Sequence, residues 1–174
     1  MNDTPKYPIT GHGSRAAPAA RAATVTRYLG ALSLLAVGID HLEQYYVDYY
    51  RAVPTIGTLF VLNFISAVLI GGGLLMPLKR LTPRLADRTR TILAVSGIGI
   101  GAGTLAGLLI SENGGLFGFM EVGYRGAIVL SIVFDATTVL LLGAFLVLRS
   151  RPGSGRAAHS RLLGRSRTHK EIAT

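Results

Sequence analysis

The chain has 174 residues, of which 49% are hydrophobic and 16% are charged, and its formal net charge is +9. Soluble domains contain about 25% charged residues, so this composition favours a membrane protein. The sequence contains no cysteine, which excludes disulfides, iron–sulfur clusters and cysteine zinc sites.

The two ends of the chain differ from its middle. Residues 1–26 contain prolines, glycines and many alanines without apolar periodicity, and residues 149–174 are basic and polar. We expect both segments to be disordered basic tails. The middle segment, residues 27–148, is expected to form one transmembrane domain.

Four long apolar blocks follow one another in this domain. A helix needs about 20 mostly apolar residues to cross a bilayer. The blocks predict transmembrane helices over about residues 28–49, 54–76, 91–111 and 124–148. Pro54 suits the first turn of the second helix, and Pro77 ends that helix. The predicted fold is an all-α membrane protein, a four-helix transmembrane bundle.

The distribution of positive charge predicts the orientation of the bundle. Sixteen of the 18 lysines and arginines lie in residues 1–27, 79–90 and 149–174, and the other two are Arg51 and Arg125. Segments rich in lysine and arginine that flank membrane helices usually stay in the cytoplasm. We therefore expect a protein of the bacterial plasma membrane with both termini on the cytoplasmic side. The same rule explains the net positive charge, so no binding of nucleic acid is needed to account for it. The expected partner is the lipid bilayer.

The outer half of the first helix is unusually polar. At about 100° per residue, Asp40, His41 and Glu43 fall on one side of the helix. The opposite side is expected to rest at the lipid–water boundary. It carries the tyrosines, which are Tyr45, Tyr46, Tyr49 and Tyr50.

Two further helices carry polar residues at a similar depth. At 1.5 Å per residue, Asn63 lies roughly 14 Å from the outer end of its helix, and Asp135 lies about 15 Å beyond Arg125. Together with Thr104 on the third helix, these residues are expected to form a ring of polar side chains at one depth in the membrane. Polar residues inside a membrane usually face the protein interior and mark function.

The connection between the third and fourth helices is too apolar for a free loop. It contains Leu116, Phe117, Phe119 and Met120, which we expect to form a lid or an interfacial segment. Glu121 and Arg125 follow at the i, i+4 spacing that suits an ion pair.

The third helix has a run of glycines at helical spacing. In lipid, small residues allow close helix–helix packing, and this run predicts such a contact within the chain, in a homo-oligomer or with a membrane-protein partner. The glycines are Gly97, Gly99, Gly101, Gly103 and Gly107.

Two interpretations of the polar residues stay open. They form either an ion-pair and hydrogen-bond network, with Arg125 or Arg51 pairing Asp40 or Asp135, or a site for an ion, proton or small ligand. Any metal is expected to be held by Asp40, His41 and Glu121. No cofactor is predicted, and haem ligation by two histidines is not expected because only His41 lies near the membrane.

The core resembles a group of uncharacterised four-helix membrane proteins of actinobacteria, and its architecture is distantly similar to that of DoxX-like proteins. Arginine greatly outnumbers lysine, which fits a GC-rich bacterial source. The resemblance implies the fold but no activity. The segments that carry it are residues 40–42, 54–63, 103–107 and 115–121.

These features lead to one expected function and one alternative. We expect a small non-enzymatic membrane component, an accessory or partner-binding protein that uses its glycine-rich face. The alternative is a protein that handles an ion, a proton or a small ligand through its polar pocket. An enzyme ranks third, because no serine, threonine or histidine occurs in a recognisable catalytic arrangement.

Overall fold

The computed structural model describes residues 16–48, 50–81, 84–118, 120 and 125–150. Four of its helices are long and apolar enough to span a membrane, namely α1 (Ala16–Val47), α2 (Pro54–Leu75), α4 (Ala86–Gly114) and α5 (Gly126–Ser150). Two short elements connect them, the 3₁₀ helix η1 (Tyr50–Ala52) and α3 (Leu78–Leu81). The described residues form no sheet, so the predicted all-α bundle is confirmed.

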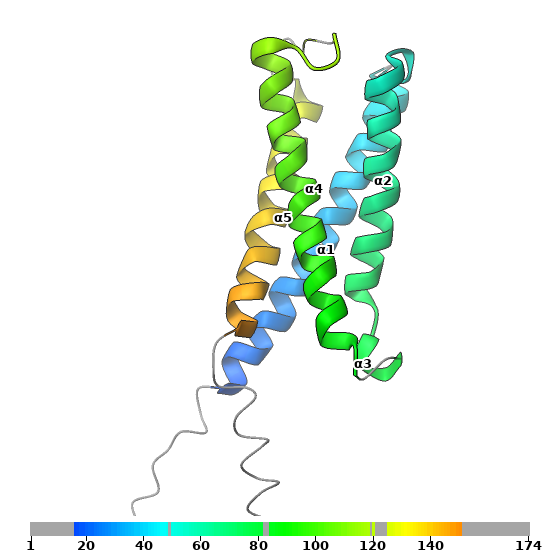
Figure 1. Ribbon diagram of the computed structural model, residues 1–174. Helices are drawn as coiled ribbons and strands as arrows, with labels where there is room; N and C mark the ends of the chain where they lie inside the picture. The colour runs from blue at the N-terminus through cyan, green and yellow to red at the C-terminus, as the bar shows by residue number, and fades with distance from the viewer. Residues whose placement is uncertain (1–15, 49, 82–83, 119, 121–124, 151–174) are drawn as a thin grey trace, which may run out of the picture.

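The long helices run alternately up and down (Figure 1). The end of the bundle that holds Ala16, Leu75, Ala86 and Ser150 is called the tail end, because α1 begins and α5 ends there. The opposite end, which holds η1 and the α4–α5 connection, is called the loop end. Helix α1 packs mainly against α2 and α5, and α4 packs against α5 and, less extensively, against α2.

Helix α1 begins at Ala16 and not near Tyr28, so the prediction of a disordered tail is wrong for residues 16–26. Alanine has the highest helix propensity, and Pro18 lies in the first turn, where proline is tolerated. A search for apolar periodicity misses such an alanine-rich turn. Residues 1–15 and 151–174 lie outside the described part of the chain.

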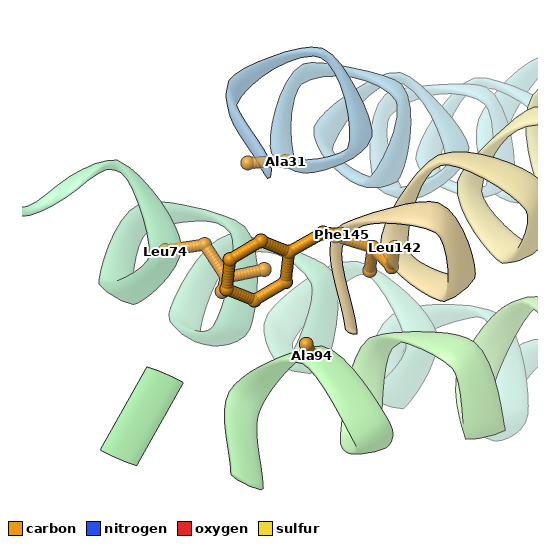
Figure 2. Close-up of a cluster of buried hydrophobic side chains, with 5 residues drawn as sticks. All are labelled: Ala31, Leu74, Ala94, Leu142 and Phe145. Carbon is orange, nitrogen blue, oxygen red and sulfur yellow. The ribbon is translucent and has the colours of Figure 1, made fainter. Parts of the chain in front are cut away.

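A cluster of buried apolar side chains lies in the half of the bundle nearest the tail end. Figure 2 shows how these side chains meet between the helices. Close approach of the helices depends on glycine. A Cβ atom added to Gly30 would lie 2.6 Å from Leu142 Cδ2, and one added to Gly97 would lie 2.7 Å from Leu142 Cδ1. Helices α1 and α4 therefore meet the same leucine of α5. The cluster consists of Ala31, Leu74, Ala94, Leu142 and Phe145.

The outward faces of the four long helices are apolar. Leu69, Leu140 and Ile39 are 69%, 71% and 63% exposed. Contiguous exposed apolar faces of this extent mark contact with a membrane or with another protein. Together with the length and hydropathy of the helices, they support a multi-pass membrane protein in contact with lipid.

Candidate functional site

A buried hydrogen-bond network joins α1 to α5 in the half of the bundle nearest the loop end. Gln44 Nε2 donates to Asp40 Oδ2 at 2.7 Å and to Ser131 Oγ at 2.8 Å. Ser131 Oγ also donates to Asp40 Oδ2. All three residues are buried. One carboxylate oxygen thus receives two side-chain donors, which stabilises a carboxylate removed from water.

Asp135 lies one helical turn beyond Ser131 on α5 and is 1% exposed. Its Oδ1 atom is buried and has no hydrogen-bond partner among the described residues, and neither has the hydroxyl of Thr138. A polar atom buried without a partner costs free energy. Asp135 therefore presents an unused acceptor in the interior of the protein.

The arginine at the start of α5 does not pair with the buried carboxylates. Arg125 Nη1 lies 3.2 Å from Asp48 Oδ1, and Arg125 Nη2 donates to the Tyr50 hydroxyl at 2.7 Å. The proposed pairing of Arg125 with Asp40 or Asp135 is therefore wrong. Arg125 instead joins the start of α5 to η1 at the loop end.

Tyr50 belongs to the interior, contrary to the expected position at the lipid boundary. It is 5% exposed, and its ring lies 4.8 Å from that of Phe60 between centroids. The helical periodicity used for the prediction no longer applies there, because α1 ends at Val47 and η1 begins at Tyr50. Tyr45 is half-buried, and Tyr46 is 57% exposed.

His41 is buried between the backbone of α1 and an aromatic ring of α2. Its Nδ1 atom lies 2.9 Å from the carbonyl oxygen of Val37, and its ring centroid lies 4.9 Å from that of Phe60. A carbonyl oxygen can only accept, so Nδ1 carries the proton. In the neutral ring, Nε2 is then an acceptor.

Asn63 connects α2 to α4. Its Nδ2 atom donates to Thr104 Oγ1 at 3.2 Å, and Thr104 Oγ1 donates to the Ile100 carbonyl at 2.7 Å. Asn63 Oδ1 is buried without a hydrogen-bond partner among the described residues. Asn63 and Asp135 therefore each contain an acceptor that no described residue uses.

His41, Asn63 and Asp135 all line a cavity of about 410 Å³ between α1, α2, α4 and α5. Most of its lining is apolar and comes from residues such as Leu59, Phe60 and Ile128. Leu116, expected in a lid, also lines the cavity, whereas Phe117 is 66% exposed. The polar part of the lining consists of His41, Gln44, Tyr50, Asn63, Ser66, Thr104, Ser111, Ser131 and Asp135.

The cavity reaches the lateral surface between α2 and α4. Gly99 and Gly103 line it and are exposed, and a Cβ atom added to either would meet no atom within 4 Å. Leu59 and Leu62 lie opposite on α2, at 41% and 52% exposed. This side of the cavity is therefore bordered by the apolar outer surface of the bundle.

The glycine run of α4 is divided between two roles. Gly97 and Gly101 face the interior, where a Cβ atom at Gly101 would lie 3.0 Å from the Asp135 carbonyl oxygen. Among the described residues, nothing lies within 4 Å of a Cβ atom added to Gly99 or Gly103, and one added to Gly107 would meet only Leu116, at 3.8 Å.

The remaining predicted site residues add no group to this cavity within the described part of the chain. Glu43 is exposed on α1, and Glu121 lies outside the described residues. Within the described part of the chain, no three His, Asp or Glu side chains are grouped to hold a metal ion. Gln44 and Ser131 were not among the predicted site residues, because their contact depends on how α1 packs against α5.

Comparison of the chain with protein families, curated proteins and solved structures finds no match. The resemblance to the actinobacterial group therefore rests on the sequence segments named above.

Proposed function

We propose that this membrane protein binds a small, lipid-soluble molecule in the cavity between its four helices. The observation that carries the proposal is the cavity itself, which combines apolar walls with a few polar side chains, among them those of His41, Asn63 and Asp135. Ligand pockets have volumes of about 300–1,000 Å³ and hold a few polar groups in a mostly apolar lining. A cavity of about 410 Å³ lies within that range.

The polar groups favour a ligand that donates hydrogen bonds. Asp135 Oδ1 and Asn63 Oδ1 are acceptors without partners among the described residues, and His41 Nε2 is an acceptor in the neutral ring. A hydroxyl or amino group would satisfy them, and a carbonyl group would not. The proposed ligand therefore has an apolar body with hydroxyl or amino substituents.

The side of the cavity between α2 and α4 favours access from the bilayer. Gly99 and Gly103 leave space on α4, and the facing surface of α2 is apolar. A molecule dissolved in the lipid would pass between these helices without crossing water.

Replacing Asp135 by asparagine tests the proposed ligand site. The change preserves size but replaces one carboxylate oxygen with a donor, so we expect ligand occupancy to fall about tenfold. Native mass spectrometry of protein purified in mild detergent measures the occupancy. Glu43→Gln is the control, because it makes the same chemical change at an exposed site on α1. A wild-type protein that carries no small molecule, or equal occupancy in wild type and Asp135→Asn, would contradict the proposal.

An accessory role remains the second candidate. Gly99 and Gly103 form an open small-residue face, which suits a helix of a partner or of a second copy of the chain. This role does not require the carboxylate of Asp135. It predicts that Asp135→Asn retains a co-purifying protein or the native oligomeric state, whereas a binding role predicts loss of the small molecule.

We further propose that the tail end faces the cytoplasm of a bacterial cell. The concentration of lysine and arginine in residues 1–27, 79–90 and 149–174 supports this orientation. Thr58→Cys and Ser154→Cys, each made alone, should differ in intact cells. A membrane-impermeant maleimide should label the cysteine at position 58 and leave that at position 154 unlabelled. Labelling at position 154 from outside would contradict the proposed orientation.

A further inference from the structure

Three arginines surround the tail end of the apolar core. Arg27 precedes Ala31 on α1 by one helical turn, Arg90 precedes Ala94 on α4 by one turn, and Arg149 follows Phe145 on α5 by one turn. The three core residues belong to the same cluster shown in Figure 2. Three different helices therefore place a guanidinium group just beyond one layer of the core.

These arginines are more buried than orientation in a membrane requires. Arg27 is 6% exposed, and the side chains of Arg90 and Arg149 are 13% and 28% exposed. Arg27 Nη1, Arg90 Nε and Arg149 Nη1 are each buried without a hydrogen-bond partner among the described residues. Cations that only set orientation can remain in water, as the exposed Arg88 does. The burial of the other three therefore needs another explanation.

Among the described residues, too little negative charge lies near the three arginines to balance them. Asp87 Oδ1 lies 3.9 Å from Arg90 Nη1 and 3.6 Å from Arg149 Nη2, so one carboxylate is shared by two arginines. Asp87 is also 64% exposed, which weakens both interactions. Arg27 lies 4.4 Å from the centroid of the Tyr28 ring and is subject to repulsion from Arg90. The cluster has an excess of positive charge and unused donors.

We propose that Arg27, Arg90 and Arg149 form a binding site for a phosphate group. Guanidinium groups bind phosphate with two parallel hydrogen bonds, and an anion would satisfy the unused donors and the excess charge together. The group belongs either to the head of an anionic phospholipid or to free phosphate. The site lies at the opposite end of the bundle from η1, so it is separate from the ligand cavity.

The test measures binding to the full-length protein, purified in detergent and depleted of lipid. Native mass spectrometry with phosphatidylglycerol and phosphatidylcholine compares an anionic with a zwitterionic head group. We expect at least tenfold preference for phosphatidylglycerol and loss of that preference in Arg149→Gln and Arg27→Gln. Arg88→Gln is the matched control, because it removes one positive charge from α4 outside the cluster.

Inorganic phosphate distinguishes the two sources of the anion. If millimolar phosphate displaces phosphatidylglycerol and raises the melting temperature of the wild type but not of Arg149→Gln, the site takes free phosphate. If it does neither while the preference for phosphatidylglycerol persists, the site takes the lipid head group. Equal binding of both lipids with no effect of phosphate would overturn the proposal. An equal loss of the preference for phosphatidylglycerol in Arg88→Gln and Arg149→Gln would also overturn the proposal. Arg149 is the most exposed of the three, so its variant serves if Arg27→Gln does not fold.

Discussion

Replacing Gln44 by methionine is expected to lower the free energy of unfolding by about 2–3 kcal/mol. Methionine preserves the length of the side chain but removes the hydrogen bonds from Nε2 to Asp40 and to Ser131. The Asp40 carboxylate then stays buried with fewer donors. Reversible unfolding in mixed micelles, followed by circular dichroism, measures the loss.

A double-mutant cycle separates this interaction from general effects on packing. If Gln44 acts through Asp40, then Asp40→Leu combined with Gln44→Met should cost less than the sum of the single changes, by about 1 kcal/mol or more. Glu43→Gln changes the exposed neighbouring side chain and should be close to neutral. Strict additivity of the two changes would show that the Gln44–Asp40 hydrogen bond contributes no stability.

Replacing Gly38 by alanine is expected to destabilise the bundle by about 1–3 kcal/mol. A Cβ atom at position 38 would lie 2.8 Å from Ala67 Cβ, and the α-carbon of Phe64 lies only 3.5 Å away. A Cβ atom cannot rotate out of the way as the end of a leucine can, so α1 and α2 must separate. The same unfolding measurement detects this loss.

Gly143→Ala provides the control for this change. It makes the same substitution in α5, where an added Cβ atom meets nothing within 4 Å. Alanine also has a higher helix propensity than glycine, so this variant should be as stable as the wild type or slightly more stable. If Gly38→Ala were equally well tolerated, close packing of α1 against α2 would not depend on glycine.

The two halves of the bundle differ in ways that suit the two proposals. Toward the tail end, glycines let α1 and α4 close around Leu142 and leave a compact apolar core. Toward the loop end, α2 and α4 diverge in Figure 1, and the cavity lies between the four helices there. The packed half near the tail end holds the four helices together, and the half near the loop end leaves space for a ligand.

Several elements were predictable because their signals are local. Pro54 begins α2 as expected, and α2 ends just before Pro77, because proline lacks an N–H and restricts the residue before it. The start of α1 was missed because alanine propensity leaves no apolar period. The position of Tyr50 was missed because the end of α1 changes the direction of the chain.

The polar site was predictable only as a set of unusual residues. Asp40, Asn63 and Asp135 stand out because a polar side chain is costly in a hydrophobic segment. Their partners depend on which helices are neighbours and how each is rotated. Asp40 contacts Gln44 on its own helix and Ser131 on α5, whereas Arg125, the expected partner, contacts Asp48.

The sequence by itself determined that the chain forms four apolar helices, because the length and hydropathy of each block are local properties of the chain. It also identified the polar residues inside them. Only the tertiary structure decided that Gly38 and Gly101 allow close approach while Gly99 and Gly103 border a cavity. It likewise brought Arg27, Arg90 and Arg149 to one level of the bundle. The physical reason is that these roles depend on the rotation and axial offset of one helix against another, which arise from packing over the whole bundle.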